Sequence, residues 1–261
     1  MVQANNKTLL VCNIMNREHF ALTLRKLYLR STLFRKLTNI ILTFRCNDLD
    51  TLTFIRTKYL ETNAIGPLQR DEAILLFGLT RTLRPKNVVE FGFCGGASAF
   101  CILGALENDA HFHTYDIMPE AAEKAKILYS HDKRLIFHLC SQAEFDSSPF
   151  LNSSVDFVFF DGAHDLAINV ETFKKIKPVL SPGAIIAVHD TGAWNKRFFG
   201  TLHNQFAESN PGGWINDELY YHQPDEVRFV EFLRTNLYAS VALHSQRCLR
   251  HGISLLQKVV G

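Results

Sequence analysis

Carboxylates, glycines and histidines gather at the ends of apolar segments in this sequence, and these are the residue types that could do chemistry. The apolar segment Asn87–Phe91 contains Glu90 and is followed by a glycine-rich bend. Gly92 and Gly96 in this bend have no side chain, so the backbone can approach a flat, polar ligand before a helix begins at about Ser98. We therefore expect this stretch to bind a ligand of the nucleotide type.

A second carboxylate, Asp116, ends the next apolar segment along the chain. At that place a carboxylate accepts hydrogen bonds from both hydroxyls of a ribose. The run of Gly92, Gly95 and Gly96 lacks the G-x-G-x-x-G spacing that holds a pyrophosphate, which argues against a nicotinamide cofactor. The acid Glu90 would repel a phosphate and attract an amino group. S-adenosylmethionine has a ribose and a cationic amino-acid end, so it satisfies both carboxylates.

Asp161 and Asp190 end two further apolar segments, which should form neighbouring strands. Two carboxylates at such a place can bind a hard cation such as Mg²⁺ through oxygen. His189 directly precedes Asp190, and imidazole suits Mn²⁺, Fe²⁺ or Zn²⁺ better than Mg²⁺. His189 therefore has three interpretations: a metal ligand, a second candidate base, or a histidine whose hydrogen bonds are satisfied at the strand end.

The elements that must position these residues alternate between strand and helix, which predicts a parallel, doubly wound sheet. The tail departs from this order, because a helix at Asp225–Leu237 precedes two strand candidates, Ser240–His244 and Gly252–Val259. We predict an α/β fold with a doubly wound, Rossmann-like, seven-stranded sheet, mostly parallel, with a C-terminal antiparallel hairpin and an N-terminal helical cap. The alternating elements are strands at Asn87–Phe91, His111–Tyr115, Leu135–Leu139, Asp156–Phe160 and Ala184–Val188, helices at Arg70–Leu83, Ser98–Glu107, Pro119–Tyr129 and Ala167–Leu180, and a turn at residues 181–183.

The sequence from about Arg17 to Thr62 predicts two or three amphipathic helices with basic residues between their apolar positions. We therefore divide the chain into a helical cap or lid at residues 1–65 and a main domain at residues 66–261. The apolar face of the cap helices would pack on the main domain or on a second subunit of a homodimer. Alternatively, their basic face would contact a membrane surface or an anionic substrate.

Composition narrows the class of protein. With 261 residues, of which 47% are hydrophobic, the chain can bury one full-sized core, and its net charge of +2 does not predict a nucleic-acid binder. The six cysteines form no C-x-x-C pair, which favours a reduced, cytoplasmic protein over a disulfide scaffold. We expect no signal peptide, because the N-terminal apolar run has neither a basic start nor a cleavage site, and no transmembrane segment, because no apolar stretch is long enough.

From about Gly66 to the C-terminus, this sequence resembles class I S-adenosylmethionine-dependent methyltransferases, and among them the family of macrocin-type sugar O-methyltransferases. A glycine loop, a second-strand acid, a D-G-x-H segment and an H-D pair, in this order, carry the resemblance together. The resembling segments are VVEFGFCGGAS (Val88–Ser98), HTYDI (His113–Ile117), VDFVFFDGAH (Val155–His164), LSPGAIIAVHD (Leu180–Asp190) and GISLLQK (Gly252–Lys258).

The resemblance implies a role for each site residue. Glu90 and the backbone of the glycine loop would hold the methionine part of the cofactor, and Asp116 would hold the ribose. Asp161 and Asp190 would hold a metal ion that orients two hydroxyls of a sugar. His164 would be the general base, and the alternative interpretation is an ordinary helix-start residue. The implied cofactor set is Glu90, Gly92, Gly96, Ser98, Asp116, Ser141, Gln142 and Asp161, with Ser141 and Gln142 beside the adenine, and the implied metal set is Asp161, His189 and Asp190.

We therefore expect an enzyme that moves a methyl group from S-adenosylmethionine to a hydroxyl of a small polyhydroxylated or glycosylated metabolite, as in secondary metabolism, with or without Mg²⁺ or Mn²⁺. Such an in-line displacement needs an aligned donor and acceptor and a base for the hydroxyl proton. Two alternatives stay open: methylation of a peptide, protein or lipid that docks on the basic N-terminal helices, and a cofactor-binding scaffold without turnover. The aromatic residues that would either wall the acceptor pocket or serve only in packing are Trp194, Trp214, Tyr220 and Tyr221.

Overall fold

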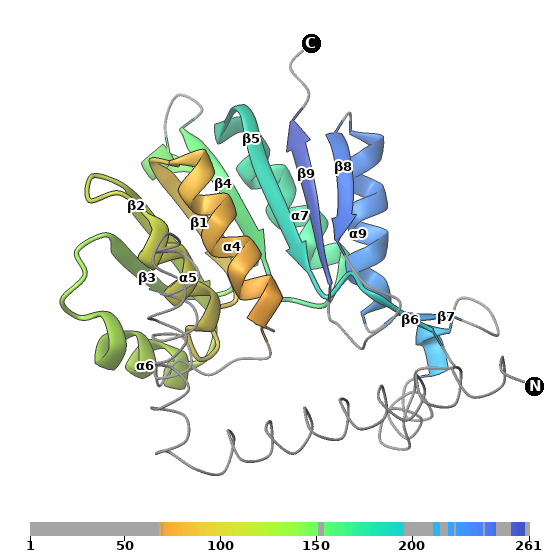
Figure 1. Ribbon diagram of the computed structural model, residues 1–261, viewed down its shortest axis with the longest axis horizontal. Coiled ribbons are helices and arrows are strands. Elements are labelled where there is room, and N and C mark those ends of the chain that lie inside the picture. Colours follow the sequence, from red (N-terminus) through yellow and green to blue (C-terminus); the bar gives the residue numbers. More distant parts are fainter. Residues whose placement is uncertain are drawn as a thin grey trace, which may run out of the picture. The chain divides into compact units, whose positions relative to one another are not determined.

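A computed structural model of the 261-residue chain describes residues 68, 70–150, 154–195, 211–214, 219–221, 223–236, 238–243 and 252–258 (Figure 1). The chain divides into two units, Met1–Leu60 and Glu61–Gly261, and every described residue belongs to the second unit. The predicted cap at residues 1–65, its helices and a dimer contact through them therefore lie outside the described residues.

A seven-stranded sheet forms the centre of the described unit, in the order β3-β2-β1-β4-β5-β9-β8 (Figure 1). Neighbours from β3 to β5 pair in parallel, whereas β9 pairs antiparallel with both β5 and β8. This arrangement confirms the predicted mostly parallel sheet with a C-terminal antiparallel hairpin. The strands are β1 (Asn87–Phe91), β2 (His111–Asp116), β3 (Leu135–Leu139), β4 (Val155–Phe160), β5 (Leu180–His189), β8 (Tyr238–Leu243) and β9 (Ile253–Lys258).

Helices cover both faces of this sheet, which is why most residues of β1 and β4 are apolar and buried. Helix α4 packs against α5 on one face, and α7 packs against α9 on the other (Figure 1). Phe91 of β1 and Phe160 of β4 meet in the core with ring centroids 4.9 Å apart, whereas Glu90 bonds Ser98 at the start of α5. The helices are α4 (Arg70–Leu83), α5 (Ala97–Ala105), α6 (Pro119–Tyr129), α7 (Leu166–Ile176) and α9 (Pro224–Thr235).

The boundary between α7 and β5 differs from the prediction. Helix α7 ends at Ile176, a 3₁₀ turn covers Lys177–Val179, and β5 already begins at Leu180. The predicted turn at residues 181–183 thus lies inside a strand. Pairing with β4 jumps from Val155↔Leu180 to Phe157↔Ile185, so the extra residues of β5 form a bulge, and Gly183 takes its positive φ of 76° there. Residues 181–183 are typical of a turn, but strand pairing between β4 and β5 continues on both sides of them.

A second, two-stranded sheet lies in the segment between β5 and α9, where no strand was predicted. Its strands β6 (Ala193–Asn195) and β7 (Leu219–Tyr221) pair antiparallel, and Trp214 forms a further bridge to Tyr220. The Tyr220 side chain is fully buried, so at least this aromatic residue serves in packing. None of the helices in the described ranges is both long and apolar enough to cross a membrane.

Candidate active site

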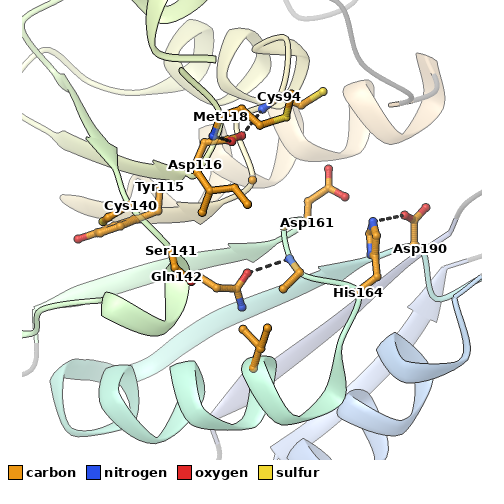
Figure 2. Close-up of a pocket in the computed structure, with 15 residues that line it drawn as sticks. Cys94, Tyr115, Asp116, Met118, Cys140, Ser141, Gln142, Asp161, His164 and Asp190 are labelled. Carbon is orange, nitrogen blue, oxygen red and sulfur yellow. Dashed lines mark hydrogen bonds and ion pairs between the residues drawn. The ribbon is translucent and has the colours of Figure 1, made fainter. Parts of the chain in front are cut away.

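A cavity of about 390 Å³ opens at the carboxyl ends of the parallel strands. The strand order reverses between β1 and β4, and open α/β sheets bind their ligands at such a reversal. Figure 2 shows Tyr115 and Asp116 on one side of this cavity and His164 and Asp190 on the other. The predicted site residues that line the cavity are Gly92, Asp116, Ser141, Gln142, Asp161, His164 and Asp190, and those that do not are Glu90, Gly96, Ser98 and His189.

Gly92 marks the closest approach of β1 and β4 at the base of the cavity. Its φ is 101°, and a Cβ added there would lie 2.1 Å from the backbone oxygen of Asp161. The backbone N–H of Asp161 in turn donates to the oxygen of Phe91 at 2.8 Å. Only glycine fits this place, because any side chain would both strain the backbone and separate the two strands.

Asp116 is held by backbone donors on both of its carboxylate oxygens. The N–H of Cys94 in the glycine loop donates to Oδ2, and the N–H of Met118 donates to Oδ1, each at 2.8 Å (Figure 2). These bonds tie the loop after β1 to the end of β2. A carboxylate has about four acceptor positions, so Asp116 can still accept hydrogen bonds from a ligand in the cavity.

Glu90 lies beneath the glycine loop rather than in the cavity. Its side chain is fully buried and accepts hydrogen bonds from the hydroxyls of Ser98 at 2.5 Å and Thr114 at 2.6 Å. Burial raises the pKa of Glu90 to about 8, although the two hydroxyls oppose this rise. The group is therefore mostly protonated at neutral pH, and it connects β1, β2 and α5.

Gln142 uses its polar atoms to hold the turn that follows β4. Its Oε1 accepts from the backbone N–H of Ala163 at 2.9 Å (Figure 2). Its Nε2 donates to Oδ1 of Asn169 at 2.8 Å. The neighbouring Ser141 accepts a hydrogen bond from the N–H of Ala143 and caps a short 3₁₀ turn. Gln142 thus offers an ordered face to the cavity, while its amide atoms are engaged within the protein.

His164 lies between two carboxylates from different elements. Its Nδ1 is 3.1 Å from Oε1 of Glu226 on α9, and its Nε2 is 3.7 Å from Oδ2 of Asp190 after β5. The hydrogen bond with Glu226 raises the pKa of His164, burial opposes this rise, and Asp190 adds to it. Asp190 has a φ of 57°, a left-handed conformation that aspartate tolerates better than most residues.

His189 is buried behind the cavity and bonds carboxylates with both ring nitrogens. Its Nδ1 is 2.9 Å from Oδ1 of Asp161, and its Nε2 is 3.2 Å from Oε2 of Glu72 on α4. Burial alone would lower the pKa of His189, but Asp161 and Glu72 outweigh burial and hold the pKa well above its usual value. The other oxygen of Glu72 accepts from the N–H of Gly252 at 2.8 Å, which joins α4, β5 and the start of β9.

The predicted metal set does come together. Ligand atoms of Asp161, His189 and Asp190 all lie within 4.8 Å of one another. Two carboxylates and an imidazole form a donor set that suits a borderline cation such as Mn²⁺. In this geometry, however, His189 donates protons to carboxylates, so a cation would have to replace the proton that lies between His189 and Asp161. The set fits a cation only after that exchange.

Glu72 and Glu226 are site residues that the sequence did not reveal. Both lie in helices, and their histidine partners are 117 and 62 residues away along the chain. Their one local signal, an acid in the first turn of a helix, has an ordinary explanation in the helix dipole. The strand-end residues could be found, because hydropathy alone shows where a strand ends.

Comparison with protein families gives a match that spans this site. Residues 89–191 match the family described as "Methyltransferase domain", a range that runs from β1 to just past Asp190. The sequence matches no curated protein. The matched range covers less than half of the chain, and it contains all the residues that line the cavity.

Solved structures show the same fold. The O-methyltransferase TomG from Streptomyces achromogenes, solved with S-adenosylmethionine, has a TM-score of 0.54 at 17% identity, over 85% of this chain and 96% of that chain. An O-methyltransferase from Bacillus cereus, solved with S-adenosylhomocysteine, has a TM-score of 0.56 at 15% identity, over 85% of this chain and 97% of that chain. At these identities, the likeness shows the shared Rossmann-like fold alone.

Proposed function

We propose that this protein transfers a methyl group from S-adenosylmethionine to a hydroxyl of a small polyhydroxylated or glycosylated molecule, as macrocin-type enzymes do. One observation supports this most: a single cavity has Asp116 on one side and His164 beside Asp190 on the other. A nucleoside on the first side would point its sulfonium toward the second. The O-methyltransferases among proteins of the same fold favour oxygen as the acceptor atom.

In this proposal, Asp116 accepts hydrogen bonds from the ribose hydroxyls, and Ser141 and Gln142 flank the adenine. Asp161 lines the cavity next to Gly92 and faces the ammonium of the methionine part. Three of the predicted cofactor residues do not line the cavity, and in this proposal they act by shaping the glycine loop. These residues are Glu90, Gly96 and Ser98.

The chemical step needs one base. The acceptor oxygen attacks the methyl carbon in line with the sulfur, so a C–O bond forms as the C–S bond breaks, and S-adenosylhomocysteine leaves. His164 takes the hydroxyl proton on Nε2, the ring nitrogen nearer Asp190. The carboxylate of Asp190 stabilises the imidazolium that results, and water then removes the proton.

A divalent cation is a second part of the proposal. Asp161, His189 and Asp190 would hold Mg²⁺ or Mn²⁺ once His189 gives up its proton, and the cation would lower the proton affinity of a bound hydroxyl. The methyl-transfer assay below is therefore run with EDTA, with Mg²⁺ and with Mn²⁺. A cation that assists the reaction would raise the rate above the value in EDTA. Equal rates would contradict the role of the cation and leave the rest of the proposal unchanged.

The test is transfer of labelled methyl groups by the purified full chain to panels of glycosides, other small hydroxyl compounds, polypeptides and lipids. We predict transfer to the small hydroxyl compounds. His164→Ala should lower kcat by about 100-fold or more, because a positioned base contributes about 10²–10⁴-fold, while the Kd of S-adenosylhomocysteine stays unchanged. The exposed His131→Ala is the matched control and should keep full activity.

Transfer to polypeptides or lipids alone would replace the proposed acceptor with the predicted alternative that docks on the N-terminal helices. Binding of the cofactor without transfer to any panel would support the scaffold instead. A homodimer through those helices, a cytoplasmic location and the absence of nucleic-acid binding stay predictions from the sequence. Among the described residues, Cys94, Cys101 and Cys140 are free thiols, as a reducing compartment would leave them.

A further inference from the structure

Glu226 on α9 is buried next to the proposed base and has no role in the chemical step described above. Its exposed fraction is 1%, and it does not line the cavity. Burial raises the pKa of its carboxyl, so this residue is costly to bury as an anion, and its surroundings must compensate. Each of its oxygens has a hydrogen-bond partner, and both partners can act as donors.

The first donor is the proposed base itself. Oε1 of Glu226 lies 3.1 Å from Nδ1 of His164. One proton occupies this line, and it leaves Nε2 as the ring nitrogen that faces Asp190 and the cavity. This is the orientation in which Nε2 can accept a proton from a substrate hydroxyl.

The second donor is Asn169 on α7. Its Nδ2 donates to Oε2 of Glu226 at 3.1 Å, and its Oδ1 accepts from Nε2 of Gln142 at 2.8 Å. Oε1 of Gln142 accepts from the backbone N–H of Ala163, the residue before His164. The hydrogen bonds therefore form a closed path that begins and ends at the turn carrying the base.

The direction of each bond from Ala163 to Glu226 is fixed. A backbone N–H can only donate, so the oxygen of the Gln142 amide must face Ala163 and its nitrogen must face Asn169. The oxygen of the Asn169 amide then faces Gln142, and its nitrogen donates to Glu226. Thr172 gives independent support, because its hydroxyl donates to the backbone oxygen of Ile168 at 2.8 Å and is left to accept from Nε2 of Gln142 at 3.3 Å. Glu226 therefore accepts a hydrogen bond from Asn169 on Oε2, which leaves Oε1 as the oxygen that can accept from Nδ1 of His164.

We propose that Glu226 is a positioning residue that holds the proton of His164 on Nδ1 and thereby keeps Nε2 free to act as the base. This inference rests on the proposed function, because it assigns His164 its orientation in that reaction. Asn169 and Gln142 serve by fixing the polarity of Glu226. The nearest chemical analogy is a histidine base oriented by a buried carboxylate.

The decisive variant is Glu226→Gln, which keeps the size of the side chain. The amide nitrogen of the new glutamine cannot face Nδ2 of Asn169, because both are donors, so it must face Nδ1 of His164. The proton of neutral His164 should then move to Nε2, the wrong nitrogen for the reaction. We expect kcat to fall by about 100-fold, with the Kd of S-adenosylhomocysteine changed less than about twofold. Glu231→Gln is the control, since Glu231 lies on the same helix but is exposed and bonds Arg234.

The second measurement needs no variant and no substrate. ¹⁵N NMR of ring-labelled histidine, assigned with His164→Gln, reports which nitrogen of neutral His164 carries the proton. We predict Nδ1–H in the parent chain and Nε2–H in Glu226→Gln. Nε2–H in the parent, or unchanged kcat in a folded Glu226→Gln variant, would overturn the inference. A parent chain that shows Nδ1–H but transfers no methyl group would instead contradict the proposed function and leave the orientation of His164 established.

Discussion

Buried acids support this site from outside the cavity. Glu72, Glu90 and Glu226 are 4%, 0% and 1% exposed, and each bonds a polar side chain on another element. A buried carboxyl must find such partners, since an isolated one would be costly. The sequence could predict Glu90, because it ends a strand beside glycines, but its role differs: the residue shapes the loop and is protonated near neutral pH.

The raised pKa of Glu90 predicts a pH-dependent stability. The pKa is about 8 in the folded chain and 4.5 as an ordinary value, so between these pH values the unfolded chain releases a proton that the folded chain keeps. The contribution of Glu90 to stability is therefore complete below about pH 4.5 and is lost as pH rises through about 8. Glu90→Gln cannot ionise, so it should remove this decline, on the order of a few kcal/mol.

Urea unfolding of the parent chain and of Glu90→Gln at pH 5 and pH 8 measures this effect. The free energy of unfolding of the parent should fall relative to that of the variant as the pH rises. Glu107→Gln, an acid in a partly exposed pair with Arg84, is the control and should follow the parent. A constant difference between the parent and Glu90→Gln at both pH values would contradict the buried, protonated state.

At the scale of elements, strands were easier to predict than their connections. The bounds of β1 and β3 match the prediction because short apolar runs between turn signals favour strands, although β1 is mostly buried and no residue of β3 is. The predicted boundary between α7 and β5 was wrong because the bulge in β5 depends on pairing with β4. That strand is distant in the sequence: Val155 and Leu180, which pair, are 25 residues apart. The sheet of β6 and β7 was not predicted, because strands of 3 residues are too short to show an alternation of apolar and polar residues.

The pairing of β2 and β3 contains an acid-sensitive pair of histidines. Nδ1 of His113 lies 3.1 Å from Nε2 of His138, and His138 stacks on Tyr115 with ring centroids 4.3 Å apart. Burial and then the charge of His138 lower the pKa of His113 to about 4, and burial lowers the pKa of His138. Because Tyr115 lines the cavity, this stack supports the cofactor side of the site.

The contribution of His113 to stability should therefore decrease as the pH falls. As pH falls from 6.5 toward about 4, the unfolded chain binds a proton on His113 and the folded chain does not, so stability present above pH 6.5 is lost in this window. His113→Phe should lose less Tm between pH 7 and pH 5 than the parent does. Calorimetry at both pH values checks this against His131→Phe, an exposed control. Equal losses of Tm in the parent and His113→Phe would contradict the prediction.

At the scale of the molecule, residues that are far apart in the sequence lie together at the carboxyl ends of the parallel strands. Gly92 follows β1 and Asp161 follows β4, and these adjacent strands are the point at which the strand order reverses. The parallel, doubly wound sheet could be expected from the alternation of elements, and with it a cavity at the carboxyl ends of the strands. The acceptor could not be predicted, because the segments expected to contact it, among them the predicted cap at residues 1–65, have no sequence pattern typical of one ligand.

The most direct test of the central claim is calorimetric titration of S-adenosylhomocysteine and of NAD into the full chain and into Asp116→Ala. We predict that S-adenosylhomocysteine binds one site, that NAD does not bind, and that Asp116→Ala weakens the first affinity by about 10–100-fold, the value of hydrogen bonds to a charged group. Asp109→Ala, which removes an exposed acid, should bind like the parent. No binding of S-adenosylhomocysteine, or equal affinity in Asp116→Ala, would contradict the account.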